Sequence, residues 1–245
     1  MTMNTLITIC ARGGSKGIPG KNVKLINGKP LIYYTLKIAN EFALINQNVK
    51  IYLSTDSIII QELVKELSFA SINTDYNRPA QLATDSAGKM DTIKDVLKYA
   101  EAKNDLSFDY ILDLDVTSPL RTIMDIENAF KKLTEVSEAL NIFSVNPANR
   151  NPYFNMVELD KNGFAQLCKN GNFLTRQSAP KVYDMNASFY IYKSSFFKMN
   201  INSAITNKSL IYEMPHMCFD LDHPIDFEFM SYLLKNNKLD FKLLT

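Results

Sequence analysis

The sequence has few of the residues that build disulfide frameworks or structural zinc sites. Its 245 residues include three scattered cysteines, none in a Cys-x-x-Cys pair, and two histidines, His216 and His223. A disulfide scaffold needs paired cysteines, and a zinc site needs cysteine or histidine ligands at close spacing, so the pattern argues against both. It fits the reducing cytoplasm, where we expect the protein to work.

The sequence also lacks a charge excess and a long apolar run. Its 27 Lys and Arg residues almost balance 26 Asp and Glu residues, so no global field favours a nucleic acid or an acidic membrane as partner. No apolar span is long enough for a membrane helix, and no basic segment precedes the first apolar run. We therefore expect neither secretion nor membrane insertion, and small molecules or soluble proteins as partners.

The apolar runs predict alternating strands and helices in a single domain over residues 1–245. We expect strands at 6–11, 49–55, 108–113, 139–145 and 187–192, and a strand end at 218–222. We expect helices at 31–39, from Ser57 to about 68, at 87–102 and 122–136, and from Pro224 to about 235. This alternation is typical of an α/β fold with a mostly parallel sheet.

The region at about 147–186 does not continue the alternation of strands and helices and is predicted to be an insertion. Residues 153–159 and 164–168 flank Asp-Lys-Asn-Gly, which predicts a β-hairpin with a glycine-bearing turn. A hairpin is marginally stable alone, so this one should pack on the body of the protein or on a second subunit.

A glycine-rich loop follows the first strand. Residues 11–22 read Ala-Arg-Gly-Gly-Ser-Lys-Gly-Ile-Pro-Gly-Lys-Asn, which places unhindered backbone N–H groups beside the cations Arg12, Lys16 and Lys21. A polyphosphate needs these groups. The alternative is a plain connecting turn, but three like charges in one short loop repel each other unless an anion or solvent separates them.

Two common phosphate-binding motifs do not fit this loop. A Walker A motif ending at Gly20 and Lys21 would have Ser15 in place of its first glycine and Asn22 in place of its metal-binding hydroxyl. The Gly-x-Gly-x-x-Gly dinucleotide motif also fails, because Gly13 and Gly14 are followed two positions later by serine and lysine. ATPase and dehydrogenase functions are therefore disfavoured.

Asp220 and Asp222 form a candidate metal site. Two residues apart at the end of an apolar strand, their carboxylates would point to one face and could share Mg²⁺. The alternative is a pair of solvated carboxylates, or a cap before Pro224. The two nearby histidines are interpreted as incidental, because magnesium prefers oxygen ligands.

Several motifs in order along the chain resemble those of CMP-sialic acid synthetases, also called acylneuraminate cytidylyltransferases. The resemblance covers nearly the whole chain and rests on residues 11–22, 27–32, 53–56, 78–83, 117–121, 176–177 and 220–222. It implies a Rossmann-like nucleotidyltransferase fold, doubly wound, with a β-hairpin dimerisation insertion. It also implies a homodimer whose active sites can include residues of both chains.

The resemblance implies that CTP gives CMP to the anomeric hydroxyl of an acidic sugar, with Mg²⁺ as cofactor and pyrophosphate as leaving group. The loop residues Ala11, Arg12, Gly13, Lys16 and Lys21 would hold the triphosphate. The cytidine side would be formed by Asn22, Arg78, Ala87 and Lys89. Arg78 could instead be a surface salt-bridge partner. No residue stands out as a general base; Asp222, acting through a metal-bound hydroxyl, is the candidate.

By the same resemblance, the sugar would be bound by Asp115, Thr117, Arg176, Asn186 and Tyr190. Arg176 would hold the substrate carboxylate, whereas Tyr190 could instead be a core residue. Asp115 stands where the family usually has glutamine, and Asp184 lies where sialic acid enzymes tend to have a basic residue. An ionised Asp only accepts hydrogen bonds, so the sugar preference should change.

These departures favour a bacterial nonulosonic acid such as legionaminic or pseudaminic acid over N-acetylneuraminate. Three alternatives stay open. The chain could be a CMP-N-acetylneuraminate synthetase proper, a CMP-ketodeoxyoctonate-type synthetase or another nucleotidyltransferase of similar fold, or a non-catalytic nucleotide-binding protein.

Overall fold

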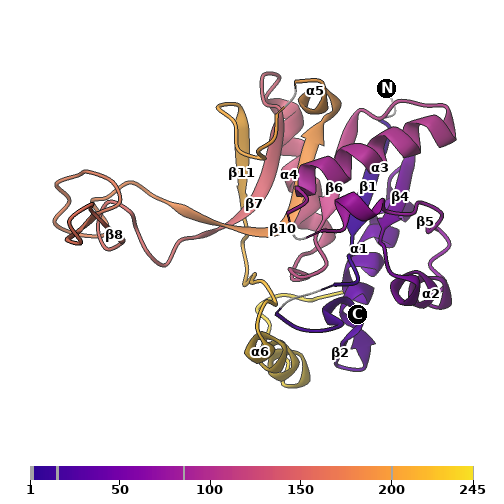
Figure 1. Cartoon of the computed structure of the whole chain (residues 1–245), viewed down its shortest axis with the longest axis horizontal. Helices are drawn as coiled ribbons and strands as arrows, with labels where there is room; N and C mark the ends of the chain where they lie inside the picture. The colour runs from indigo at the N-terminus through magenta and orange to yellow at the C-terminus, as the bar shows by residue number, and fades with distance from the viewer. Residues whose placement is uncertain (1–2, 15–16, 85, 200, 245) are drawn as a thin grey trace.

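A central sheet of seven strands organises the protein. The structure is a computed structural model that describes residues 3–14, 17–84, 86–199 and 201–244. The strands lie in the order β11-β7-β10-β6-β1-β4-β5, and neighbours run parallel except at β10, which is antiparallel to both β6 and β7 (Figure 1). Their bounds are β1 Thr5–Cys10, β4 Val49–Ser54, β5 Ile72–Asn73, β6 Tyr110–Leu114, β7 Asn141–Pro147, β10 Tyr183–Lys193 and β11 Ser209–Glu213. The predicted α/β fold with a mostly parallel sheet is confirmed.

Helices cover both faces of this sheet. They are α1 Leu31–Ile45, α2 Ile58–Glu66, α3 Lys89–Asn104, α4 Ile123–Glu135, α5 Ser194–Phe197 and α6 Pro224–Lys235, with short 3₁₀ helices η1 Lys21–Val23 and η2 Ala80–Leu82. One buried cluster joins α1, α2 and α4 to the sheet, and a second joins α3 and α5 to its other face. Alternate side chains of β1 divide between them, Leu6 into one cluster and Ile7 into the other, as expected for a strand buried on both sides.

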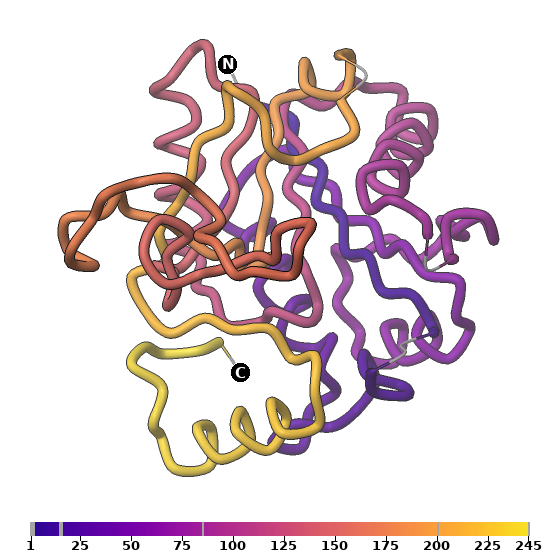
Figure 2. The backbone as a smooth tube through the Cα atoms, turned by 60° about the vertical axis from the view of Figure 1, so that its left-hand side comes forward, coloured from indigo at the N-terminus to yellow at the C-terminus, as the bar shows by residue number. Residues whose placement is uncertain are grey.

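Local signals in the sequence place the helix starts correctly. The Ser57 hydroxyl accepts a hydrogen bond from the Ile60 N–H at 3.4 Å and caps α2. Thr122 and Asp125 form a capping box at the start of α4. Helix α6 begins at Pro224, as predicted, and packs beside the small hairpin of β2 Leu25–Ile26 and β3 Lys29–Pro30 (Figure 2).

Two segments differ from the prediction. Residues 218–222 are not a strand but an irregular segment, whose backbone bonds to separate partners, such as the Leu221 N–H to the Thr117 carbonyl at 2.8 Å. The last strand of the sheet is instead β11, which pairs with β7 alone. An edge strand of five residues gives only a weak apolar pattern in the sequence, and the polar loop before it gives no signal for where the strand begins.

Residues 148–182 leave the sheet between β7 and β10 and form an arm that projects from the body (Figure 1). The predicted hairpin is present within it, formed by β8 Val157–Leu159 and β9 Ala165–Leu167, with Gly163 at a positive φ of 86° in the turn. Several large apolar side chains of the arm are exposed, among them Leu159, Phe164 and Leu174. In the part of the chain that the structure describes, none of the helices has the length and apolar character needed to cross a membrane.

Candidate active site

A cavity of about 310 Å³ opens where β1 and β6 end at the carboxyl edge of the sheet. Open α/β sheets bind ligands at this edge. Eight predicted site residues line it, namely Arg12, Lys21, Asn22, Arg78, Ala87, Lys89, Asp115 and Thr117.

The glycine-rich loop is held against neighbouring elements by its backbone. The Ala11 N–H donates to the Ser54 carbonyl at 2.9 Å, and the Gly13 N–H to Asp56 Oδ1 at 2.8 Å. A Cβ on Gly13 would lie 2.9 Å from the Cβ of Ser57, so only glycine fits this approach to α2. Asn22 closes the loop by donating from Nδ2 to the Arg12 carbonyl at 2.9 Å. Lys16 lies outside the described residues.

The loop also contacts the segment that carries the predicted metal ligands. Lys21 Nζ lies 2.9 Å from Asp222 Oδ1, with the lysine side chain 12% exposed and the aspartate side chain 60% exposed. A Cβ on Gly17 would lie 2.7 Å from the Asp222 carbonyl oxygen. The structure thus brings together two regions about 200 residues apart in sequence.

Arg78 lines the cavity and is buried. Its Nε donates to the Ser54 hydroxyl at 3.0 Å and its Nη2 to the Ser54 carbonyl at 2.8 Å. The alternative of an exposed surface salt-bridge partner is therefore wrong. Ala87 lines the cavity beside it, just before the start of α3.

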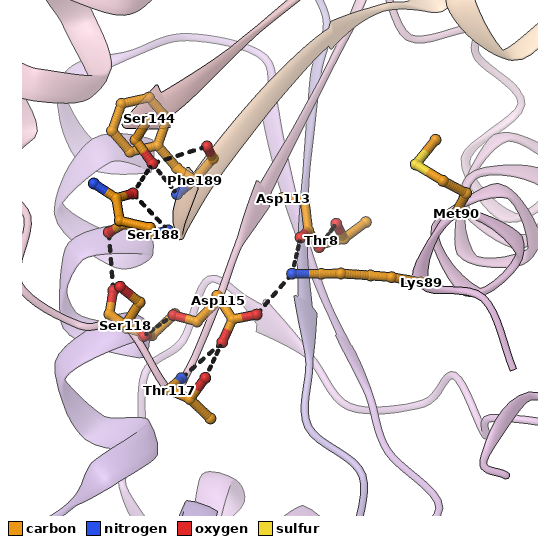
Figure 3. A network of polar contacts seen from close by, with 12 residues as sticks. Thr8, Lys89, Met90, Asp113, Asp115, Thr117, Ser118, Ser144, Ser188 and Phe189 are labelled. Atoms are coloured by element: carbon orange, nitrogen blue, oxygen red, sulfur yellow. Dashed lines mark hydrogen bonds and ion pairs between the residues drawn. The ribbon is translucent and has the colours of Figure 1, made fainter. Parts of the chain in front are cut away.

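Lys89, the first residue of α3, lies between two carboxylates (Figure 3). Its Nζ is 2.8 Å from Asp113 Oδ2 and 2.7 Å from Asp115 Oδ2. Burial alone would lower the pKa of Lys89, but the two carboxylates raise it well above its usual value. Burial alone would raise the pKa of Asp115, but Lys89 and hydrogen bonds from Thr117 lower it to about 2.

Both carboxylate oxygens of Asp115 already have partners within the chain. Oδ2 accepts from Lys89, and Oδ1 accepts from the N–H and the hydroxyl of Thr117 at 2.8 Å each. The carboxylate is therefore used to orient Lys89 and Thr117, which limits what it can accept from a sugar.

Asp220 has a buried oxygen, Oδ1, that has no hydrogen-bond partner among the described residues. Asp113 Oδ2 also lacks a hydrogen bond there, but it lies 2.8 Å from Lys89 Nζ in an ion pair. Burial raises the pKa of Asp220 to about 6, helped by the charges of Asp115 and Asp222 and opposed by a hydrogen bond with Ser118. A buried carboxylate oxygen without a partner is what a bound cation would satisfy, so Asp220 and Asp222 fit Mg²⁺.

Asp220 and Asp222 do not make a complete metal site alone. Among the described residues, no group of three or more His, Cys, Asp or Glu side chains could hold a metal ion. Magnesium usually keeps several waters and is held by one or two carboxylates together with substrate phosphates. The two carboxylates fit that kind of site.

The other predicted sugar-binding residues lie in different surroundings. Asn186 is buried, its Oδ1 accepting from the Ser144 hydroxyl at 2.6 Å and its Nδ2 donating to Asn146 at 3.0 Å. Tyr190 lies beside Lys89, whose Nζ is 5.3 Å from the ring centroid. Arg176 lies on the arm, where its Nη2 donates to the Ala148 carbonyl at 2.7 Å, and it does not line the cavity.

Sequence reasoning missed Asp113 and Arg121. Asp113 is fully buried in β6 and also accepts from the Thr8 hydroxyl at 2.7 Å. Arg121 is fully buried and donates to the carbonyls of Asp115 and Ser188 and to the Thr35 hydroxyl. The sequence did contain signals for both. Asp113 lies in an apolar strand and Arg121 ends the Thr-Ser-Pro-Leu-Arg motif, and a charged residue that is buried needs a partner.

A parallel sheet with a cationic glycine-rich loop and an acidic pair at its carboxyl edge defines a nucleotide-binding α/β protein. More narrowly, the chain belongs to the cytidylyltransferase family, whose family model matches residues 6–242.

Named relatives and solved structures agree with this family. The chain is 38% identical to a post-translational flagellin modification protein B of Campylobacter coli, over 97% of each chain. It is 37% identical to a CMP-N,N'-diacetyllegionaminic acid synthase of Campylobacter jejuni, over 96% of each. A solved CMP:2-keto-3-deoxy-manno-octonic acid synthetase complexed with CTP has the same fold, with a TM-score of 0.62 at 16% identity over 96% of this chain and 99% of that one.

Proposed function

We propose that this protein transfers CMP from CTP to the anomeric hydroxyl of a nonulosonic acid and releases pyrophosphate. The observation that carries the proposal is one cavity in which the cationic loop meets Arg78, Lys89 and Asp115, with the Asp220–Asp222 pair held against the loop through Lys21. The names of the Campylobacter relatives support the nonulosonic acid as acceptor. The cytoplasmic location stays a prediction from the cysteine pattern.

The nucleotide would lie along the loop. Arg12 and Lys21 would face the triphosphate, and Lys21 keeps donors for it, because an ammonium has three N–H groups and Asp222 takes one. Asn22, Arg78 and Ala87 would surround the cytidine, with Lys89 at the far side. These groups are fixed before the nucleotide binds, which lowers the entropy cost of orienting it.

Asp220 and Asp222 would hold magnesium. When bound, the ion neutralises charge on the phosphates and on the leaving pyrophosphate. Two observations support this role: Asp220 has a buried oxygen to which no described residue bonds, and Asp222 is exposed beside the loop.

The acceptor would enter between Lys89, Thr117 and Tyr190. Lys89 uses two of its three N–H groups on Asp113 and Asp115 and keeps one as a donor for the sugar. The Thr117 hydroxyl gives its one proton to Asp115, so it would face the sugar as an acceptor. We propose a legionaminic-type acid as acceptor, in line with the C. jejuni relative.

A pyrophosphate-release assay tests the reaction and the acceptor. Purified protein with CTP and Mg²⁺ should turn over a diacetylated legionaminic acid with a higher kcat/KM than N-acetylneuraminate or ketodeoxyoctonate, and CTP should be preferred over the other nucleotides. A highest kcat/KM for N-acetylneuraminate would reject the acceptor. Absence of turnover with all three acids would reject the function.

We also propose that the arm joins two chains into a homodimer. The exposed apolar side chains of the hairpin, Val157, Leu159 and Phe164, favour burial against another surface. Leu159→Lys should shift the sedimentation coefficient towards that of a monomer. Leu44→Lys, which changes an equally exposed leucine on α1, should leave it unchanged.

Arg176 would then act in the partner's active site. Two inactive variants, Arg176→Ala and Asp222→Asn, should complement each other when mixed and re-associated, because one site of each mixed dimer has both residues intact. We expect recovery of about a quarter of wild-type activity. No recovery in verified mixed dimers would show that Arg176 does not act across the dimer.

A further inference from the structure

The segment that carries Asp220 and Asp222 belongs to no helix or sheet, yet it is held at several points. The Met217 N–H donates to both Asp240 oxygens at 3.1 Å each, and the Cys218 carbonyl accepts from Asn146. The Asp222 N–H donates to Asp226 at 2.8 Å. At its beginning lies His216, interpreted from the sequence as incidental, whose side chain is only 7% exposed in the structure.

Both nitrogens of the His216 ring have hydrogen-bond partners, and an aromatic ring stacks on it. Its Nε2 lies 2.9 Å from Asp125 Oδ2, and its Nδ1 lies 3.0 Å from the Met217 carbonyl oxygen. The ring stacks on Phe241 with 3.8 Å between centroids. Both nitrogens face acceptors, and only the doubly protonated imidazolium can donate to both.

Asp125 connects this histidine to the body of the protein. Its Oδ2 also accepts from the N–H and the hydroxyl of Thr122 at 2.7 Å each, and its Oδ1 from the Tyr212 hydroxyl at 3.2 Å. The carboxylate thus joins the start of α4, strand β11 and the acidic segment. Burial would raise the pKa of Asp125, but hydrogen bonds from His216 and Thr122 lower it.

We propose that His216 is a positioning residue for the cytidylyl transfer, because its ion pair with Asp125 fixes the beginning of the segment that places Asp220 and Asp222. This inference rests on the proposed magnesium site. Neighbours that orient ligating residues typically change metal affinity by about 10- to 100-fold when they are removed.

The ion pair also has a defined dependence on pH. Burial would lower the pKa of His216, but hydrogen bonds to Asp125 and Met217, with the charges of Asp125 and Asp240, raise it. The groups that face the ring are therefore Asp125 on α4, Asp240 on the C-terminal segment and the neutral Tyr212 nearby on β11. A raised histidine pKa means that the stabilisation is complete at low pH and is lost as pH rises through the folded-state value.

The test uses the fact that the chain has two histidines. In tag-free protein, the C2–H proton signal of His223 should broaden when Mn²⁺ binds the acidic pair, because His223 directly follows Asp222. We compare wild type with His216→Phe, which keeps a ring to stack on Phe241 but loses both hydrogen bonds. Val64→Ala on α2 is the control for a loss of stability elsewhere.

We expect His216→Phe to need about tenfold more Mn²⁺ for half-maximal broadening of the His223 signal. His216→Gln, which keeps a donor without the charge, should give an intermediate value and serves if the phenylalanine variant does not fold. Val64→Ala should match wild type. In wild type, the His216 signal should titrate above a histidine's usual pKa of about 6.5.

Unchanged Mn²⁺ affinity in folded His216 variants would overturn the inference. Asp220→Asn and Asp222→Asn separate it from the proposed metal site. If those two variants also bind Mn²⁺ as wild type does, the metal site itself is wrong. If they lose binding while His216→Phe keeps it, only the role of His216 is wrong.

Discussion

The same tripeptide, Asp-Leu-Asp, occurs twice in this chain, at residues 113–115 and 220–222. Both central leucines are fully buried. Both tripeptides lie at the carboxyl edge of the sheet, close enough for the charge of Asp115 to raise the pKa of Asp220. In their local sequence they are nearly indistinguishable.

The two tripeptides differ in the groups around their carboxylates, and these shift the pKa values in opposite directions. The first pair holds Lys89 between its carboxylates, and the pKa of Asp115 is lowered to about 2. In the second pair, Asp220 has a buried oxygen that finds no partner in the described part of the chain, and its pKa is raised to about 6. A carboxylate pair whose two members share one protein cation serves to position its neighbours. The second pair shares no cation, since Lys21 contacts Asp222 only, and this unfilled pair can take a ligand.

The largest expected effect comes from changing the unfilled pair. Asp222→Asn should lower kcat/KM by about a thousandfold, because removing a metal ligand costs several kcal/mol of transition-state stabilisation. Thermal unfolding should stay cooperative. Turnover close to the wild-type value would show that the two tripeptides do not differ in function as proposed.

Removing the cation from the filled pair should cost stability. Lys89→Met leaves the fully buried Asp113 without its ion-pair partner, and we expect a loss of about 2–3 kcal/mol in urea unfolding, below the value for a fully buried pair because Lys89 is partly exposed. Lys37→Met on α1 breaks a more accessible pair with Glu41 at 2.9 Å and should cost less than about 0.5 kcal/mol. Equal losses of unfolding free energy in Lys89→Met and Lys37→Met would show that the Lys89 pair contributes no more to stability than an exposed ion pair.

The pH dependence of Asp220 offers a more subtle test. Its folded-state pKa of about 6 lies above the ordinary 3.8, so folding is favoured below the ordinary value and loses this contribution as pH rises to about 6. Without divalent metal, Asp220→Asn should therefore lose less stability than wild type between pH 4 and pH 6. Melting curves across this range measure the difference. An equal loss of stability in wild type and Asp220→Asn would mean that burial does not raise the pKa of Asp220.

The smallest effect is expected for Asp115, whose pKa is shifted the other way. A lowered pKa contributes stability above the ordinary 3.8, and that contribution is lost as pH falls towards about 2. Asp115→Asn should be less stable than wild type by about 1 kcal/mol at neutral pH, since Asp113 still holds Lys89. The two proteins should converge in acid. A constant gap down to pH 2 would contradict the assigned pKa.

Much of the fold could be predicted because its signals are local. Buried parallel strands appear as apolar runs, Ser57 and Thr122 mark helix starts, and the glycine turn marks the hairpin. The glycine-rich loop was likewise visible, since its glycines and cations are adjacent. The strand at 209–213 was missed and segment 218–222 was wrongly predicted as a strand end, because an edge strand and an irregular segment depend on partners that no local pattern reveals.

By itself, the sequence determined most of the strands and helices in their order, the loop with its cations and the two Asp-Leu-Asp tripeptides. Only the tertiary structure decided which pair is filled. Lys89 reaches Asp113 and Asp115 from the start of α3, whereas Lys21 reaches Asp222 across 201 residues and leaves Asp220 Oδ1 without a partner among the described residues. A carboxylate's pKa depends on its burial and on the charges that folding brings within a few ångströms, and neither is encoded in its immediate neighbours.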